Sequence, residues 1–505
     1  AFVPSSLLLS VTAYLSSDVS PVPLMWVVPL AIYLLSFMLV FSRLPAGVHR
    51  IFTVALPLFV LAQIYHLFTQ HAGENYSMLR LALVHLATFF SAAMVCHGEL
   101  ARTRPASSFL TEYYFWLSLG GVLGGLFNAL VAPLVFNSLA EYPLAMSLAC
   151  VFSPLALWRW PGGRGWLDLP IAAVIGLLSG VILFYTWKQE PVWPIAVCIS
   201  LCAFVVGRPV AFGLSAAALF AVVGYFDDVI DHVVLRHRDF YGVLRVRTDA
   251  DEEFYYLDHG RIRHGQQRRD DDPAVRNLPL AYYYATSPIG QVFAAPLPVL
   301  RSNLPVAVIG LGVGSLAYYG RPEQEFTFYE IDPAVERLAR DDRYFTYLRD
   351  SRADCRVVLG DARLSLAGAP DGHYGLIVVD AFSGDAIPVH LMTHEAMRLY
   401  LEKLAPGGVL AFHISNQFLD LGPVLGNLAA ASSLVAWNEI ETTVSAEEKA
   451  SGKASSHWVI LAQDEADFGP LIEDLRWRLL TPVAGLPLWT DDYTSLWGIA
   501  HWGSQ

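Results

Sequence analysis

The sequence is poor in charge, and the charge that it has is unevenly distributed. Only 16% of the 505 residues are charged, whereas 54% are hydrophobic. Charges are sparse from Ala1 to Phe226 and reach an ordinary density only from Asp227 onward. A chain of this length accommodates two or three domains, and the change in composition predicts that the first of them ends near residue 226.

Basic patches are lacking, and cysteine is scarce. The net charge is −13, and no cluster of Lys and Arg is interleaved with aromatic residues, so we expect no nucleic-acid partner. No pair of the five cysteines has the spacing of zinc ligands or of a disulfide framework. We therefore expect buried thiols and no metal. No cleavable signal peptide is expected either.

Long hydrophobic segments dominate the first domain. A membrane-spanning helix needs about 20 mostly apolar residues. The candidate segments are 5–17, 22–42, 51–69, 78–98, 109–131, 139–158, 168–187, 191–207 and 209–226. Lys and Arg lie in alternate connecting segments, which the positive-inside rule assigns to the cytoplasm. Residues 1–226 are therefore predicted to form a transmembrane helical domain in the inner (cytoplasmic) membrane, with the lipid bilayer as its partner.

Two polar or small-residue motifs interrupt these segments. The run "SLGGVLGGL" provides small residues for close helix contact, and packing is its ordinary interpretation. In "MVCHGELARTRP", His97 and Glu99 lie at a helix end beside Arg102 and Arg104. Ionisable residues at membrane depth suggest a functional site, but an ion-pair cluster at the membrane surface explains them equally well.

The pattern changes again in the second half of the chain. Residues 227–290 alternate apolar and polar side chains around turn signals such as "DHG", which predicts antiparallel β-hairpins. Within 291–505, continuous apolar strands alternate with helical segments, which predicts a parallel, doubly wound sheet. The fold class is therefore a multi-span α-helical membrane domain, a small antiparallel β-hairpin domain and an α/β Rossmann-like domain of the S-adenosylmethionine methyltransferase type.

Ligands of such sheets bind beyond the carboxyl ends of the strands, and chemically suitable residues stand at these ends. Glycines allow a tight turn and close approach of a ligand to a helix N-terminus. A carboxylate after the second strand can accept both ribose hydroxyls, and one after the third can accept the adenine amino group. The predicted cofactor-binding residues are Gly310, Gly312, Gly314, Glu330, Asp332, Asp361 and Ala362.

The spacing of these residues favours an adenosine cofactor over a dinucleotide. The turn reads G-x-G-x-G and not G-x-G-x-x-G. A second acid after the third strand fits S-adenosylmethionine or a relative better than NAD(P). A turn-capping role remains open for each of the acids.

The motifs "IGLGVGSL", "YEID", "GDAR", "DAF" and "LAPGGVLAFH" resemble the polyamine aminopropyltransferases, or spermidine synthases. The resemblance covers about residues 235–420, and the first half is similar to bacterial membrane-fused spermidine synthase-like proteins. It implies that residues 227–290 cap the active site and that 291–505 form the catalytic domain. It also implies decarboxylated S-adenosylmethionine as co-substrate, with a diamine or polyamine as the second substrate.

The resemblance also implies roles for single residues. Asp380 corresponds to the aspartate that deprotonates the attacking amine, and a carboxylate at a strand end suits this chemistry. Asp385 is expected to hold the distal ammonium of a diamine. Gln266, Tyr282 and Tyr283 are expected to contact the substrate from the capping side, with ordinary packing as the alternative.

The sequence departs from the family at three places. Val313 replaces an acid in the glycine turn that holds the aminopropyl ammonium in the soluble enzymes. The family's DSSDP loop reads "DAFSGD", and "AVRNLPLAYYY" replaces its DE-x-x-Y segment. Three functions therefore remain open. They are an aminopropyltransferase, an enzyme that uses intact S-adenosylmethionine for methyl transfer or for cleavage to methylthioadenosine, and a non-catalytic polyamine- or nucleotide-sensing transporter.

The orientation in the membrane follows from the cofactor. If every candidate segment crossed, the region after Phe226 would lie outside the cell, whereas such cofactors are kept in the cytosol. We therefore expect one apolar segment after residue 43 not to cross fully, which gives about eight spans and a catalytic domain in the cytoplasm. A homo-oligomer is possible.

Overall fold

The computed structural model describes residues 1–16, 25–42, 45–70, 78–155, 165–186, 192–260, 262–382, 388–416, 419–496 and 498–499. The chain divides into two compact units, Ala1–Val243 and Leu244–Gln505, and each is described by itself. Strand β1 (Val233–Arg238) belongs to the first unit by this division. The two boundaries between the three domains inferred from the sequence stay predictions.

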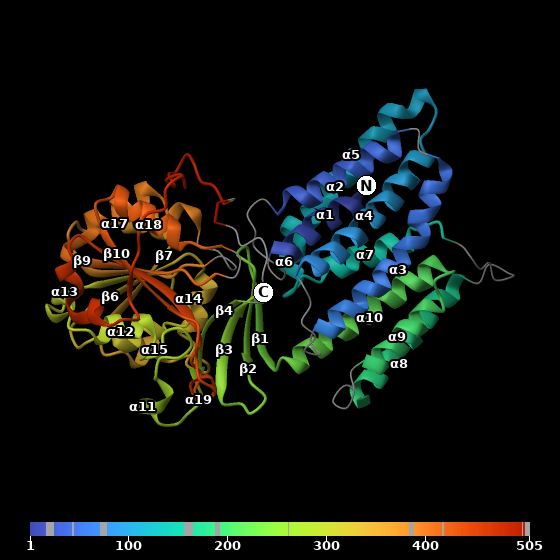
Figure 1. The fold of residues 1–505 in the computed structure, drawn as a ribbon. Helices are drawn as coiled ribbons and strands as arrows, with labels where there is room; N and C mark the ends of the chain where they lie inside the picture. The colour runs from blue at the N-terminus through green and yellow to red at the C-terminus, as the bar shows by residue number, and fades with distance from the viewer. Residues whose placement is uncertain are drawn as a thin grey trace. The chain divides into compact units, whose positions relative to one another are not determined.

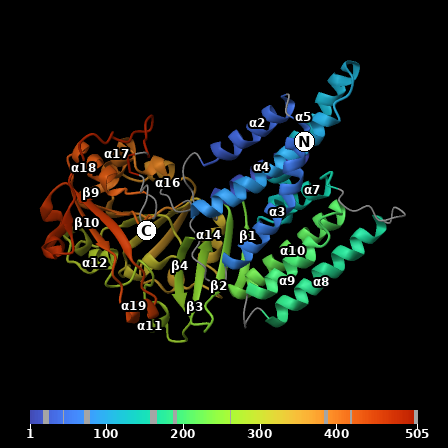
Figure 2. The same ribbon diagram turned by 45° about the vertical axis from the view of Figure 1, so that its right-hand side comes forward.

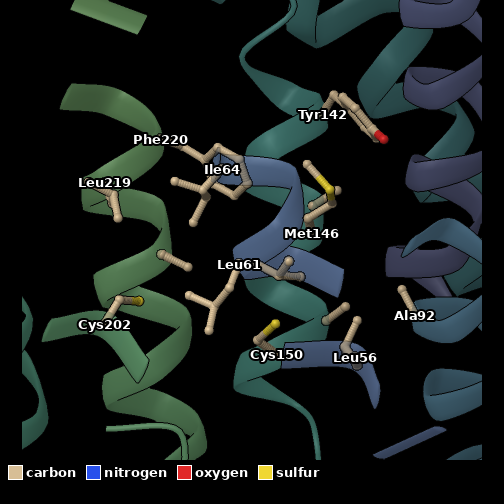
Figure 3. Packing of buried hydrophobic residues seen from close by; sticks show 14 of the residues in the cluster. Leu56, Leu61, Ile64, Ala92, Tyr142, Met146, Cys150, Cys202, Leu219 and Phe220 are labelled. Atoms are coloured by element: carbon tan, nitrogen blue, oxygen red, sulfur yellow. The ribbon is translucent and has the colours of Figure 1, made fainter. Parts of the chain in front are cut away.

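The first unit is a bundle of helices (Figure 1). Its α-helices are α1 (Phe2–Tyr14), α2 (Val27–Phe41), α3 (Ala46–Gln70), α4 (Met78–Arg102), α5 (Leu110–Leu126), α6 (Ala132–Val135), α7 (Glu141–Val151), α8 (Asp168–Thr186), α9 (Val192–Ala203) and α10 (Pro209–Ile230). Apolar side chains from α3, α7 and α10 pack together in the core, as Ile64, Met146 and Phe220 illustrate (Figure 3). Fully buried apolar residues on several helices make this a single packed core.

Helix length separates the possible membrane spans from shorter helices. Within the part of the chain that the structure describes, five helices are long and apolar enough to cross a membrane by length and composition. They are Gly47–Thr69, Arg80–Arg102, Ser107–Val135, Gly165–Thr186 and Pro209–Ile230. Shorter apolar helices cover Phe2–Tyr14, Val27–Phe41 and Trp193–Ala203. The expected number of about eight spans stays a prediction.

The two interruptions of the apolar segments have structural explanations. A Cβ atom on Gly124 would lie 2.4 Å from the carbonyl oxygen of Phe2, so the expected close helix contact is confirmed there. Glu99 bonds His49 at 2.7 Å and Arg102 at 2.8 Å, which is the ion-pair cluster that the sequence offered as one interpretation. His97 is buried and its Nδ1 lies 3.0 Å from the Ser36 hydroxyl.

The second unit contains a small antiparallel sheet followed by a large mixed sheet. The small sheet includes β2 (Val243–Thr248), β3 (Phe254–His259) and β4 (Ile262–Arg268), and both pairings are antiparallel, as expected from the sequence. The large sheet has the order β12-β10-β11-β9-β8-β5-β6-β7. Its strands are β5 (Val306–Ile309), β6 (Glu325–Glu330), β7 (Asp354–Leu359), β8 (Tyr374–Val379), β9 (Leu404–His413), β10 (Val435–Glu441), β11 (Ser456–Ala462) and β12 (Arg478–Leu479).

The prediction of a wholly parallel sheet is correct for five strands and wrong for three. Strands β5 to β9 are parallel, whereas β11, β10 and β12 are added antiparallel at one edge. Helical segments separate these strands too, with α18 (Gly422–Ala431) between β9 and β10 and α19 (Ala446–Ala450) between β10 and β11, so the alternation of strands and helices did not reveal their antiparallel direction.

Helices cover both faces of the large sheet. Helices α17 (His394–Lys403) and α18 (Gly422–Ala431) lie on one side of it, and α12 (Pro288–Ala294) lies on the other (Figures 1 and 2). The remaining helices are α11 (Pro273–Arg276), α13 (Pro298–Arg301), α14 (Pro333–Ala339), α15 (Tyr347–Asp350), α16 (Ala362–Ala367) and α19 (Ala446–Ala450). The chain order reverses between β5 and β8, and such a switch point is where open α/β sheets bind ligands.

Candidate active site

The glycine turn after β5 is closely packed on both sides. Gly310, Gly312 and Gly314 have φ angles of 101°, 54° and 82°, which L side chains rarely adopt. A Cβ on Gly310 would lie 2.4 Å from the Asp380 carbonyl oxygen, and one on Gly312 would lie 2.3 Å from that of His264. The turn therefore lies against the ends of β8 and β4, and only glycine fits there.

The helix expected after this turn is not formed. Residues Ser315–Tyr319 make only a five-residue 3₁₀ helix. Such a short element does not provide the helix N-terminus on which the ligand-binding argument relied. The glycine turn instead allows a ligand to approach its backbone closely.

Glu330 links the end of β6 to the glycine turn. Its two carboxylate oxygens accept the N–H of Leu311 at 3.0 Å and that of Asp332 at 2.9 Å. Burial raises the pKa of Glu330, and the backbone donors oppose that shift. Each oxygen has a second lone pair, so the side chain retains acceptor capacity for ribose hydroxyls.

The two other predicted acids cap helices. Asp332 accepts the N–H of Ala334 at 2.7 Å at the start of α14. Asp361 accepts that of Leu364 at 2.9 Å at the start of α16, where Ala362 is the first helical residue. Helix capping thus accounts for one carboxylate oxygen of Asp332 and one of Asp361. The second oxygen of Asp361 lies 3.2 Å from the His390 ring, so this acid keeps a polar group beside the end of β7.

Asp380 follows β8 directly and stands at the switch point. Its side chain is only 2% exposed. One carboxylate oxygen accepts the hydroxyl of Tyr283, and the other lies 2.7 Å from Nδ1 of His413. A buried carboxylate between two donors is held in one orientation, and each of its oxygens keeps a lone pair for a further ligand.

Aromatic rings enclose this carboxylate. His413 is stacked between Tyr282, at 4.4 Å between ring centroids, and Trp458, at 4.6 Å. Burial, and then the charge of Asp380, raise the pKa of Tyr282 and of Tyr283 well above the ordinary tyrosine value. Both tyrosines therefore stay protonated at neutral pH and act as hydrogen-bond donors.

The remaining predicted residues lie in different surroundings. Gln266 is buried, and its amide donates to the Gly452 carbonyl at 2.7 Å while accepting from Arg263 at 3.0 Å. Asp385 lies outside the described residues. Val313, at the position where the family carries an acid, is fully buried against Gly265 of β4.

Sequence reasoning missed three contributors to the site, namely His413, Ser415 and Trp458. Polar residues at the end of the strand in "LAFHIS" were a usable signal, because the carboxyl ends of neighbouring parallel strands meet at one edge. No signal pointed to Trp458, which comes from an antiparallel strand. Among the described residues no three His, Cys, Asp or Glu side chains are grouped to hold a metal ion, and the cysteines there are free thiols.

The fold and the site define an α/β protein with a buried carboxylate beside a glycine turn at a switch point. No protein-family model matches the chain. The polyamine aminopropyltransferase of Vibrio vulnificus (strain CMCP6) is 39% identical over 120 residues, which are 22% of this chain and 37% of that protein. A probable polyamine aminopropyl transferase of Bifidobacterium longum (strain NCC 2705) is 34% identical over 128 residues, 24% and 27% of the two chains.

Solved structures with a similar fold include two spermidine synthases. The probable spermidine synthase from Corynebacterium glutamicum matches at a TM-score of 0.37 with 14% identity, over 52% of this chain and 98% of that one. The spermidine synthase from Thermotoga maritima matches at 0.33 with 16% identity, over 50% and 81%. The chain spans about a third of the length of the curated relatives that it matches. The predicted resemblance to spermidine synthase-like proteins is confirmed within that part.

Proposed function

We propose that this protein is a membrane-bound aminopropyltransferase. It transfers an aminopropyl group from decarboxylated S-adenosylmethionine to a diamine and releases methylthioadenosine. The observation that carries the proposal is the placement of Asp380, buried at the switch point, beside the glycine turn and oriented by two donors.

The chemistry needs a base at this position. A protonated amine has no lone pair and cannot attack, so it first transfers one proton to the Asp380 carboxylate. The amine nitrogen then forms a bond to the carbon beside the sulfonium, and the carbon–sulfur bond breaks with its electron pair going to sulfur. Sulfur becomes a neutral thioether, and the overall reaction releases one proton. Holding amine and carbon in line supplies much of the rate enhancement.

The co-substrate would be held at the ends of β5, β6 and β7. Glu330 offers its free lone pairs to the ribose hydroxyls, and Asp361 with Ala362 offers polar contacts to the adenine. The glycine turn allows the sulfonium portion to approach the backbone. In this arrangement Asp332 supports the site by capping α14.

A second candidate is an enzyme that uses intact S-adenosylmethionine. Val313 is fully buried and packs against Gly265, so the glycine turn presents no carboxylate to the amine tail of the cofactor. An uncompensated ammonium placed there would lose its hydration without gaining a partner. This observation favours methyl transfer or cleavage over recognition of the decarboxylated cofactor.

The helical unit supports a membrane location. Helix α8 has 19 residues, which rise about 28 Å and match a hydrocarbon core of about 30 Å. Trp166 and Tyr185, near its two ends, are 72% and 73% exposed, as in the aromatic belts of membrane proteins. Helices α7 and α9 have only 11 and 12 residues, or about 17 and 18 Å, and of these two α9 is our choice for the apolar segment that does not cross fully. The catalytic domain then lies in the cytoplasm.

Product analysis decides between the candidates. Purified full-length protein is incubated with either cofactor and a panel of diamines, and the products are identified by mass spectrometry. Methylthioadenosine together with an aminopropylated amine supports the proposal. Methylthioadenosine without a modified amine indicates cleavage, and S-adenosylhomocysteine indicates methyl transfer. Absence of any product would leave a sensor or transporter as the function.

A further inference from the structure

A chain of three hydrogen bonds runs from the edge of the sheet to the proposed base. The backbone N–H of His457 donates to Oγ of Ser415 at 2.8 Å. Oγ of Ser415 lies 2.8 Å from Nε2 of His413, and Nδ1 of His413 lies 2.7 Å from Asp380. We propose that His413 is the positioning residue of the reaction and that Ser415 holds it in the Nδ1–H tautomer. This assignment rests on the proposed function of Asp380 as the base.

The groups at the two ends of this hydrogen-bond chain determine which atoms donate and which accept. Ser415 Oγ accepts the backbone N–H of His457 and still has its own proton, which it can donate to Nε2 of His413. A neutral imidazole that accepts at Nε2 carries its proton on Nδ1. That proton faces the carboxylate of Asp380, which when ionised only accepts hydrogen bonds. All three groups are therefore satisfied in one arrangement.

Packing keeps the imidazole from turning away. The His413 side chain is 4% exposed. Tyr282 and Trp458 cover its two faces, and the Phe382 ring stands edge-on at 5.0 Å between centroids. A ring flip would place Cδ2 and Cε1 where Nδ1 and Nε2 lie and would break both hydrogen bonds at once. The geometry is that of a side chain fixed by its surroundings.

The fixed donor has a consequence for the base. The Nδ1–H donates to one oxygen of the Asp380 carboxylate and so stabilises the ionised form that takes up the proton of the amine. It also fixes the carboxylate plane, and with it the lone pairs that meet the amine. The charged or titratable neighbours on the other packed elements are Tyr282, Tyr283, Arg263 and His457.

The same distances also suit a serine nucleophile with its base and orienting acid. The two assignments differ in the reactivity of Ser415. As part of a positioning chain it is an ordinary hydroxyl, whereas a nucleophile reacts with a fluorophosphonate. Peptide mapping after exposure of the full-length protein to such a probe distinguishes them, and labelling of Ser415 would overturn our proposal.

Two substitutions separate positioning from a structural role. His413→Asn places an amide N–H near the position of Nδ1, so we expect kcat within about fivefold of wild type. His413→Leu removes the donor, and we expect kcat to fall about ten- to a hundredfold with the KM for the cofactor unchanged. His373→Asn, on a half-buried histidine before β8, is the matched control.

Equal losses of kcat in the Asn and Leu variants would show that His413 only supports packing. A spectroscopic measurement tests the tautomer without relying on turnover. In full-length protein with ¹⁵N-labelled histidine, the resonances that His413→Asn removes must show a proton on Nδ1. A proton on Nε2 would refute the inference even in an active enzyme. A correct tautomer in a protein that forms no product would instead refute the proposed function.

Discussion

Replacing Asp380 by Asn is the sharpest test of the mechanism, because the structure predicts a large kinetic effect and a small effect on stability. Asn keeps the size of Asp and one acceptor oxygen. Its amide group can face Nδ1 of His413 if that ring adopts the other tautomer and donates to Ser415. The oxygen then still accepts from Tyr283. In that arrangement only the Ser415 hydroxyl proton loses its acceptor, so the free energy of unfolding should fall by about 1 kcal/mol.

Asn keeps hydrogen bonds of Asp380, but it cannot replace Asp380 in the proton transfer. A neutral amide does not take up the proton of an ammonium, so kcat should fall by about 10² to 10⁴, as for the loss of a general base. Titration calorimetry should show nearly unchanged cofactor binding, because Glu330 and Asp361 are untouched. The assay is release of methylthioadenosine, measured by chromatography.

A matched control lies at the other end of the same strand. Asp371 precedes β8 and forms an ion pair with Lys403. Asp371→Asn makes the same chemical change without approaching the site, and should leave kcat within about twofold. A value of kcat for Asp380→Asn within threefold of wild type would remove Asp380 from the mechanism.

Three further predictions follow from the described residues. Glu330→Gln should weaken cofactor affinity about tenfold, because a charged acceptor of the ribose hydroxyls becomes neutral; unchanged calorimetry would place the cofactor elsewhere. A cysteine introduced at the exposed Glu252, with Cys355 changed to Ser, should react with a membrane-impermeant label only after the cells are broken, and labelling of intact cells would contradict a cytoplasmic catalytic domain. Burial lowers the pKa of His264 to about 3 and of His457 to about 4. Between these values and a pH of about 6.5, the unfolded chain binds more protons than the folded protein. The free energy of unfolding is therefore highest above pH 6.5 and falls below that pH by up to about 1.4 kcal/mol per pH unit for each histidine. Thermal unfolding followed by tryptophan fluorescence checks this, and His264→Asn should weaken the dependence.

The parts of the fold that could be predicted are those with a local signal. Runs such as "VAVI" and "GLIVV" are apolar throughout because the parallel strands are buried on both faces, and each was found. Asp380 could be placed because it ends such a run. The antiparallel strands at the edge carry weaker signals, since "VAWNEIE" mixes apolar and charged residues. The ends of the apolar helices in the first unit have only a change of composition as their signal in the sequence.

The local role of single residues was less predictable. Each of the acids Asp332 and Asp361 caps a helix, which an Asp at a strand–helix junction often does. Tyr283 was named for a substrate contact on the strength of resemblance, yet its hydroxyl bonds Asp380. A partner 97 residues away in sequence is set by how the elements pack, and no local pattern reveals it.

The contact between Asp380 and His413 could not be predicted from the sequence, although each residue lies within a motif that was recognised. Tyr374 pairs with Leu404, whereas Leu376 pairs with Val409, so β9 contributes three residues more than β8 over this stretch. The extra residues fall at "PGG", where Gly407 has a φ of 74° that favours glycine. Beyond the irregularity Val379 lies opposite Phe412, which brings the next residues, Asp380 and His413, side by side. Without it Asp380 would face Leu410 and have no donor from that strand. The site therefore depends on an irregularity in the sheet, and the glycine that permits it lies within the motif "LAPGGVLAFH", where nothing in the sequence shows the resulting register.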